Sequence, residues 1–403
     1  MSTTTTSIVS DRIKNMEESA TLKMSQMVRD LKAKGHDVIS LSLGEPDFDT
    51  PKHIKKAAKK ALYAGYTKYT PVPGLMELRE AICTKFKRDN NLDFTPNNIV
   101  VSNGAKQSIY NLCMAMLNPG DEVIIFAPYW VSYAAIVKLA GGVPVEVFAG
   151  IKEDFKVSPQ QVEEAITDRT KFVLFSSPCN PTGSVYNGKE LEAIANVIGK
   201  HEQVHIVADE IYEHINFLDG GHVSIGSFPS VKDKTITVNG FAKGFAMTGW
   251  RLGYIGAPVA IAKACAKLQG QVTSGANAFS QMGGAHALLS DLKPTRKMNK
   301  AFAKRKKLVL KLLKKIKGVK VNNPDGAFYV FPDISEFIGK STGDTTIEND
   351  IDFCEYILNT AYVGVVPGTA FGAPGCFRLS YAASEDTLKE AISRIASALE
   401  KLS

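Results

Sequence analysis

Residues 99–127 read IVVSNGAKQSIYNLCMAMLNPGDEVIIFA and join two short apolar runs through a helical pattern. The runs Ile99–Ser102 and Val123–Phe126 show few polar side chains and little alternation, as is typical of strands buried on both faces of a sheet. The apolar positions between the runs keep a helical spacing and are Ile109, Leu112 and Met116. The helix is expected to stop at Asn118-Pro119-Gly120. A strand, a helix and a second strand in this order predict a mostly parallel sheet with helices on its faces.

Further β-rich runs bounded by turn residues follow at Lys171–Ser176, His205–Ala208 and Thr235–Val238. The pattern changes after Pro294. A basic helix there is followed by short strand candidates, VKVNN, GAFYVFPD and FRLSYA, and by a final helix with Ser384 as its expected N-cap. This mixed order predicts a second, smaller α+β domain.

The bulk properties of the chain are those of a folded protein. Its 403 residues allow two domains, or one large domain with a smaller lobe. A content of 44% hydrophobic and 22% charged residues argues against disorder. The N-terminus, MSTTTTSIVSDR, lacks the apolar segment of a secretory signal, and no apolar stretch approaches the ~18 residues that span a membrane. We therefore expect a protein that is neither secreted nor embedded in a membrane.

The cysteines occur singly, without the C-x-x-C pairs that indicate a zinc cluster or a disulfide framework; they are Cys83, Cys113, Cys179, Cys265, Cys354 and Cys376. Reduced thiols of this kind predict a cytoplasmic protein. His201 and His205 are four residues apart, as two metal ligands on a helix can be. Because the strand-like run VHIVADE begins between them, we expect no metal site.

The net charge of +7 is unevenly distributed, since Arg296–Lys320 holds twelve Lys or Arg residues and no acid. Apolar residues recur within this segment at roughly helical spacing, which predicts one amphipathic helix with a basic face. Such a face can contact nucleic acid or an anionic surface. No aromatic stacking platform interleaves the charges, so a solvated helix face is favoured and no nucleic-acid partner is expected.

Residues suited to chemistry collect where the predicted strands end, which is where open α/β sheets bind ligands. The first strand ends in SNGAKQ, where Gly104 and Ala105 let the backbone approach an anion at a helix N-terminus. The later strands end in SSPCNPTG, ADEIY and NGFAKGFAMTGWR. In the last of these, Lys243 stands among Gly, Ala and aromatic residues with no neighbouring acid, and burial of such an unpaired charge is costly.

This ordered series resembles the pyridoxal-phosphate aminotransferases of fold type I, class I, and within them the aspartate aminotransferase branch that carries GEPDFDTP. The matching motifs are N-P-T-G, D-E-I-Y, K-x-x-x-M-T-G-W-R and R-L-S-Y, and the likeness runs from SATLKMSQMVRDL to FRLSYA. The resemblance implies an α/β fold whose large domain has a mostly parallel seven-stranded sheet. It also implies an N-terminal arm that packs with the small domain (1–50), a large cofactor-binding domain (51–293) and a C-terminal small domain (294–403). The N-terminal helix is expected around Lys14 to Lys34.

By this resemblance Lys243 is the residue that holds pyridoxal 5'-phosphate as a Schiff base. A lysine among apolar residues has a depressed pKa, which favours the neutral amine that such a bond requires. Asp209 resembles the ionic partner of the ring nitrogen, which must stay protonated for the ring to draw electrons. Tyr212 and Asn180 resemble the donors to the ring's phenolate oxygen, and Trp130 of APYW resembles the aromatic residue that stacks on the ring.

The resemblance also implies a phosphate site, in which Arg251 meets the phosphate beside the Gly104-Ala105-Lys106 turn. A guanidinium fork suits a phosphate better than a point charge does. Tyr69 of TKYTPVPG would reach the phosphate of a neighbouring subunit, which implies a homodimer with shared active sites. Many relatives carry a serine directly before the lysine. Here that residue is Ala242, so one phosphate contact is absent or replaced.

For the substrate, Arg378 of CFRLSYA resembles the family's clamp on the α-carboxylate, with further contacts from Gly44, Asn180 and Trp130. Lys106 resembles the lysine that meets the distal carboxylate of a dicarboxylate. Alternatively, Lys106 only begins a helix and adds positive charge near the phosphate. A lysine at a helix start is unfavourable unless an anion offsets it, which favours the substrate role.

The activity implied is reversible amino transfer between an L-amino acid, with aspartate favoured, and 2-oxoglutarate in two half-reactions. Lys243 would move a proton between the substrate Cα and the cofactor's C4′ carbon. Transfer from aromatic amino acids or to prephenate, and a C–S lyase activity on the same fold, remain alternatives. A cofactor-binding regulator that uses the Arg296–Lys320 face on nucleic acid is an alternative outside the enzymes.

Overall fold

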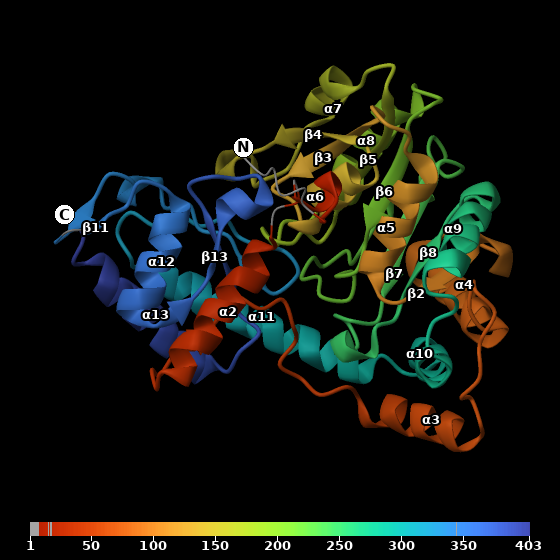
Figure 1. Ribbon diagram of the computed structural model, residues 1–403, viewed down its shortest axis with the longest axis horizontal. Helices are drawn as coiled ribbons and strands as arrows, with labels where there is room; N and C mark the ends of the chain where they lie inside the picture. The colour runs from red at the N-terminus through yellow and green to blue at the C-terminus, as the bar shows by residue number, and fades with distance from the viewer. Residues whose placement is uncertain (1–7, 15, 17, 344) are drawn as a thin grey trace, which may run out of the picture.

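A seven-stranded sheet is the framework of the larger part of the protein, in a computed structural model that describes residues 8–14, 16, 18–343 and 345–403 (Figure 1). The strand order is β2-β8-β7-β6-β5-β3-β4, and all neighbours are parallel except β8, which is antiparallel to both β2 and β7. The strands are β2 (Ile99–Ser102), β3 (Glu122–Ala127), β4 (Val143–Phe148), β5 (Thr170–Ser176), β6 (His205–Asp209), β7 (Thr235–Gly240) and β8 (Gly253–Gly256). The predicted α/β fold with a mostly parallel sheet is confirmed.

Helices cover both faces of this sheet because successive side chains of each buried strand point to opposite sides. In β3, Val123 and Ile125 join the core beneath α5, α6 and α9, whereas Ile124 and Phe126 join the core on the other face. The helices of the larger part are α3 (Lys52–Tyr63), α4 (Met76–Asn90), α5 (Ala105–Met116), α6 (Ser132–Leu139), α7 (Pro159–Ala165), α8 (Gly188–Gly199), α9 (Val259–Val272) and α10 (Ala278–Leu289).

The smaller part surrounds a separate apolar core, with the helices α2, α11, α12 and α13 grouped together in Figure 1. Its main sheet is three-stranded, in the order β13-β14-β9. A parallel pair joins the N-terminal arm to this part, since Ile39 of β1 pairs with Val363 of β12. The elements of the smaller part and of the arm that packs with it are α2 (Ala20–Ala33), β1 (Ile39–Ser40), α11 (Lys293–Leu313), β9 (Tyr329–Val330), β10 (Ser341–Thr342), β11 (Thr345–Thr346), α12 (Asp350–Ala361), β12 (Val363–Gly364), β13 (Val366–Pro367), β14 (Phe377–Ser380) and α13 (Glu385–Leu399). The short helix α1 (Asp11–Lys14) precedes them in the chain.

Several sequence expectations differ from the structure in detail. The helix expected around Lys14 to Lys34 corresponds to α2, which begins at Ala20 and ends at Ala33, and a short helix α1 ends at Lys14; residues 15 and 17 lie outside the described residues. The run VKVNN forms no strand and contributes only an isolated bridge between Lys320 and Asp333. The basic helix ends at Leu313 and does not continue to Lys320. The residues after it form turns, and one of them, Gly318, has a φ of +89°, which no right-handed helix contains. Ser384 caps the final helix as expected, accepting a hydrogen bond from the Thr387 amide.

No helix in the described part of the chain is both long enough and apolar enough to cross a membrane.

Candidate active site

A cavity of about 320 Å³ lies at the carboxyl edge of the large sheet, and we refer to it as the active-site cavity. Almost all of the predicted site residues line it, and they come from segments that follow β1, β2, β3, β5, β6 and β7 and from β14. They are Gly44, Gly104, Ala105, Lys106, Trp130, Asn180, Asp209, Tyr212, Lys243, Arg251 and Arg378. Tyr69 is the exception. It is 97% exposed and lines a second hollow between residues 66–70 and 275–279.

Lys243 follows β7 and points into the active-site cavity, where its Nζ donates to the Gly44 carbonyl at 2.5 Å. The strand β8 runs antiparallel to β7, so the loop that joins them begins and ends at the same edge of the sheet. This loop carries both Lys243 and Arg251. Burial, reinforced by the positive charge of Arg378, lowers the pKa of Lys243 to about 8. About a tenth of this amine is therefore neutral at pH 7, far more than for an ordinary lysine, and this fraction can act as a base.

Asp209 ends β6 and is fixed by two donors. Its Oδ2 accepts from the Tyr133 hydroxyl at 2.7 Å, and its Oδ1 accepts from the Ile211 amide at 3.1 Å. Burial raises the pKa of Asp209 to about 6 despite these bonds. A cationic N–H placed in the cavity beside this carboxyl would stabilise its ionised form. This is the property required of the partner of a protonated ring nitrogen.

The turn before α5 is shaped to hold an anion against the backbone. Gly104 has a φ of +85°, and a Cβ at this position would lie 2.6 Å from Arg251 Nη2. A Cβ on Gly253 of β8 would lie 2.3 Å from the Ala105 amide nitrogen. Arg251 Nη1 donates to the Thr248 carbonyl at 3.0 Å, which orients the guanidinium. Close backbone approach, a free helix N-terminus and an arginine together suit a phosphate dianion.

Arg378, on β14 of the smaller part, reaches the same cavity as a buried cation. It donates to Asn180 Oδ1 at 2.9 Å and to the Ser42 carbonyl at 2.6 Å. Its guanidinium lies 4.7 Å from the ring centroid of Tyr329 and 4.9 Å from that of Phe371. In the described part of the chain Arg378 has no carboxylate partner, and its Nε is buried without a hydrogen bond. A buried arginine in this state is suited to binding an anionic ligand.

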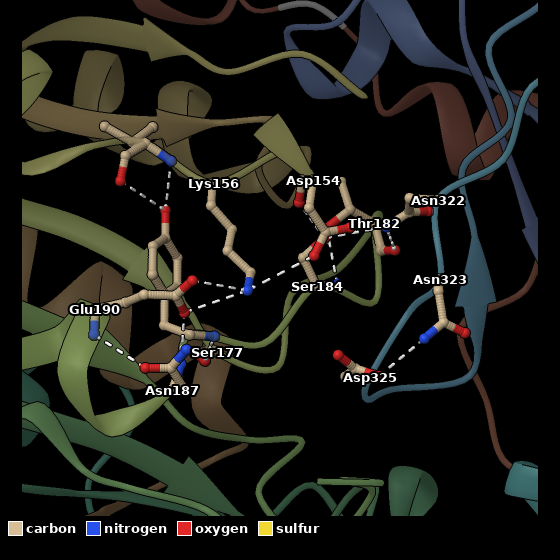
Figure 2. A network of polar contacts seen from close by, with 12 residues as sticks. Asp154, Lys156, Ser177, Thr182, Ser184, Asn187, Glu190, Asn322, Asn323 and Asp325 are labelled. Carbon is tan, nitrogen blue, oxygen red and sulfur yellow. Dashed lines mark hydrogen bonds and ion pairs between the residues drawn. The ribbon is translucent and has the colours of Figure 1, made fainter. Parts of the chain in front are cut away.

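The loop that carries Asn180 also contains Thr182 and Ser184, which belong to the polar network in Figure 2. Asn322 Nδ2 donates to Asp154 Oδ1 at 2.8 Å and to Ser184 Oγ at 3.2 Å. Ser184 Oγ in turn donates to the Asp154 carbonyl at 2.7 Å. Gly183 packs so closely on the segment after Asn322 that a Cβ there would lie 2.4 Å from Pro324. These contacts explain the small residue at the end of N-P-T-G and fix the loop before any ligand binds.

Lys106, at the start of α5, contacts the ring of Trp130. Lys106 Nζ is 4.9 Å from the centroid of the Trp130 ring, and burial together with Arg251 lowers the pKa of Lys106. Tyr212 hydrogen-bonds through its hydroxyl to the Tyr329 hydroxyl at 2.7 Å. Its phenol is thereby held against β9, which carries Tyr329.

Some of the residues that line the active-site cavity were not predicted from the sequence. Tyr133 was missed although it bonds directly to Asp209, because a tyrosine in the run VSYAA carries no local sign of its partner. Ser19, Thr21 and Leu22 at the start of α2 also line the cavity, and Thr21 Oγ1 is buried without a partner in the described chain. The remaining unforeseen lining residues are Val131, Ser132, Ser176, Ile211 and Tyr329.

The chain belongs to the class I and II aminotransferase family, whose model matches residues 36–395. It is 47% identical over 389 residues to an aspartate/prephenate aminotransferase of Cereibacter sphaeroides, which covers 96% of this chain and 97% of that one. Among solved structures it is similar to an aspartate aminotransferase from Rhizobium meliloti, with a TM-score of 0.95, 42% identity, and coverage of 98% and 99% of the two chains. A Thermus thermophilus aspartate aminotransferase solved with maleate matches with a TM-score of 0.90 and 42% identity over 97% and 99% of the two chains.

Enzymes of this family use pyridoxal 5'-phosphate, and the residues of the cavity fit that cofactor. The close approach of Gly104 to Arg251 suits its phosphate, the carboxyl of Asp209 suits its ring nitrogen, and Lys243 suits its aldehyde. When bound, the cofactor supplies a ring that accepts electron density from the substrate Cα.

Proposed function

We propose that the protein transfers the amino group of L-aspartate to 2-oxoglutarate, in two half-reactions at the active-site cavity. The observation that carries this proposal is that two cations of the cavity, Arg378 and Lys106, have no carboxylate partner among the described residues, in addition to Lys243 and Arg251, which we assign to the cofactor. A dicarboxylate supplies one anionic group to each of them. The relatives named aspartate or aspartate/prephenate aminotransferases support the same substrate class.

Three residues act on the substrate or on its binding group, and they are Arg378, Asn180 and Lys243. Arg378 pairs with the α-carboxylate in a bidentate manner and so fixes the direction of the Cα–H bond. Asn180, which already accepts from Arg378, keeps the guanidinium in the plane of that pair. The Lys243 amine, whose pKa of about 8 leaves a neutral fraction at neutral pH, takes the proton from the substrate Cα.

The test is a visible absorbance titration of the purified holoenzyme with L-aspartate and with L-glutamate, followed by steady-state assays with 2-oxoglutarate. Both dicarboxylic amino acids are expected to shift the cofactor band, and 2-oxoglutarate is expected to restore it. A panel of aromatic and aliphatic donors provides the comparison. A band that responds only to aromatic donors, or release of a thiol and ammonia from a C–S substrate, would replace this proposal by one of the alternatives.

A second candidate acceptor is prephenate, because it also carries two carboxylates and several relatives are named for it. The same pair of cations, Arg378 and Lys106, serves either acceptor. Prephenate tested with aspartate as the donor decides whether this activity accompanies the first one.

We further propose that the protein is a cytoplasmic homodimer with shared active sites. Tyr69 lies outside its own cavity and is almost fully exposed, which suits a contact with a partner's phosphate. All six cysteines are free thiols, which suits a reducing compartment. The basic run gives little support for nucleic-acid binding, because Lys304, Arg305 and Lys306 are paired with acids from other segments.

The domain organisation that we propose consists of an N-terminal arm (1–50), a large domain (51–293) and a small domain (294–403). The pairing of β1 with β12 supports the attachment of the arm to the small domain. Because Arg378 comes from the small domain and Lys243 from the large one, substrate is expected to draw the two together. Crystal structures with and without a dicarboxylate inhibitor test this closure, and identical domain positions would contradict it.

A further inference from the structure

Behind the carboxyl edge of β6, on the side away from the active-site cavity, lies a buried group of ionisable residues that the proposed reaction does not use. We call it the Lys85 network, and it consists of Lys85 and Asn90 from α4, Glu210 and Glu213, and His222 and Ser224. The side chains of Lys85, Glu210, Glu213 and His222 are between 0% and 8% exposed. Ionised groups are placed so deeply only where they are paired.

The contacts of the network converge on the two glutamates. Glu213 accepts from Lys85 Nζ at 2.5 Å and from Asn90 Nδ2 at 2.9 Å. Glu210 Oε2 accepts from Ser224 Oγ at 2.5 Å and from Asn90 Nδ2 at 3.2 Å, and lies 3.0 Å from His222 Nε2. Asn90 thus donates to both carboxylates, while its own Oδ1 accepts from Lys85 at 2.6 Å.

The oxygen and nitrogen atoms of Glu210, Glu213 and His222 are close enough together to suggest a metal site. The ammonium of Lys85, however, lies 2.5 Å from the Glu213 carboxylate and supplies the positive charge that an ion would bring. Burial opposes the ionised form of Glu213, but Lys85, His214 and His222 outweigh it and lower the pKa of Glu213. The network is therefore stabilised by its own charges and needs no metal ion.

The chain between residues 209 and 213 connects this network to the cavity. Asp209 and Tyr212 point into the active-site cavity, whereas their neighbours Glu210 and Glu213 point into the network. A turn links the two sides, because the Glu213 amide donates to the Glu210 carbonyl at 2.9 Å. Any shift of either glutamate would move an adjacent cavity residue through one peptide bond.

We propose that Glu213, held by Lys85, and Glu210, held by Asn90 and Ser224, are positioning residues that set Asp209 and Tyr212 against the cofactor ring. The inference rests on the proposed cofactor contacts of Asp209 and Tyr212. Rigid support of this kind commonly determines how well the residues in contact with a ligand perform. The network acts on the ring end of the cofactor and leaves the substrate carboxylate clamp at Arg378 untouched.

The test compares the wild-type holoenzyme with the double variant Lys85→Met/Glu213→Gln, which removes both charges and keeps the size of both side chains. We expect a folded protein that releases cofactor at least about tenfold faster. We also expect a shifted pH midpoint of the visible absorbance band and little change in KM for aspartate. The control is Lys87→Met, on the same helix, which removes the exposed 2.7 Å pair with Asp93 and should leave all three values unchanged.

A folded double variant with wild-type cofactor release and a wild-type pH midpoint overturns the inference. If the double variant does not fold, Ser224→Ala, which removes one donor to Glu210 and one acceptor of Asn90 but no charge, decides the matter by the same readouts. Faster release in Ser224→Ala supports the positioning role, and unchanged release contradicts it. Failure of the proposed function looks different, since the wild-type protein itself would then show no band that responds to aspartate.

Discussion

Lys106 stands at the first turn of α5 with no carboxylate partner in the described part of the chain, and burial lowers its pKa. A distal substrate carboxylate would pair with it in a partly desolvated cavity, and truncation of one side of such a pair costs roughly 2–5 kcal/mol. Lys106→Ala should therefore lower kcat/KM for aspartate by at least roughly tenfold, at ~1.4 kcal/mol per decade. The change for phenylalanine should be much smaller. Equal losses for both donors would show that Lys106 serves the phosphate instead.

The pKa of about 8 for Lys243 predicts how the rate of cofactor uptake depends on pH. Only the neutral amine reacts with an aldehyde, so protein stripped of cofactor should take up pyridoxal 5'-phosphate faster as the pH rises. The rate should reach half of its maximum near pH 8, well below the value for an ordinary lysine. Absorbance during reloading measures this rate, and Lys243→Ala is the control that should show no covalent uptake. A midpoint above pH 10 would contradict the buried amine.

Among single residues, those that carry chemistry in their local sequence were predictable. Lys243 was conspicuous because an ammonium among Gly, Ala and aromatic residues is expensive to bury, and Gly104 because a strand ends there and a helix begins. Tyr133 and Lys85 were not predictable, because their roles depend on partners 76 and 128 residues away. A single sequence does not reveal such pairings.

At the scale of elements, the loop between β1 and α3 depends on one arginine of the basic helix α11. Arg305 forms a bidentate pair with Asp47 at 2.6 and 2.9 Å, and its guanidinium lies 5.1 Å from the Phe48 ring centroid. The same loop offers its Gly44 carbonyl to Lys243 and its Ser42 carbonyl to Arg378. One charge of the basic run is thus engaged in holding the loop over the active-site cavity.

Substitution of Arg305 tests whether its pair with Asp47 supports the loop or whether the arginine only adds to the positive surface charge. Arg305→Ala is expected to reduce the free energy of unfolding by about 1–2 kcal/mol, since the lost pair is bidentate and only partly exposed. It should also raise KM for aspartate more than it lowers kcat. Lys304→Ala is the matched control, because Lys304 is 72% exposed and should change stability by less than about 0.5 kcal/mol. Denaturant unfolding and steady-state kinetics measure both effects, and equal behaviour of the two variants would contradict this role.

Two strands, β4 and β8, were not predicted from the sequence because their residues are not typical of a buried strand. The strand β4 lies at the edge of the sheet, contains Pro144 and is only partly buried, so it lacks the apolar run of a central strand. The strand β8 begins and ends in glycine, a residue depleted in strands, and follows the lysine loop without a turn signal. Central strands such as β3 and β5 were predicted within one or two residues because burial on both faces leaves them apolar.

For the whole molecule, the shared-site dimer can be tested by complementation. Tyr69→Phe removes a hydroxyl that would serve the partner's site, and Lys243→Ala removes the base of the subunit's own site. Each homodimer should have low activity, since a hydrogen bond to a charged group is worth about 1.5–3 kcal/mol and the base is indispensable. Mixed dimers of the two variants should regain one intact site per dimer, which activity assays on reassembled subunits would detect. No recovery from mixtures proven to be heterodimeric would exclude a shared site.

The parallel pairing of β1 with β12 also constrains the order in which a newly made chain can fold. A ribosome releases the arm first, yet its apolar residues Met24, Val28 and Leu41 belong to a core whose members come mostly from Met298 onward. Throughout most of translation these side chains lack most of their native surface, and chaperones bind exposed apolar segments of this kind. Arg378 is also made after these residues. The residues proposed to hold the cofactor, the last of which is Arg251, are therefore made before the arginine proposed to bind the substrate carboxylate, so a growing chain acquires its cofactor contacts before this substrate contact.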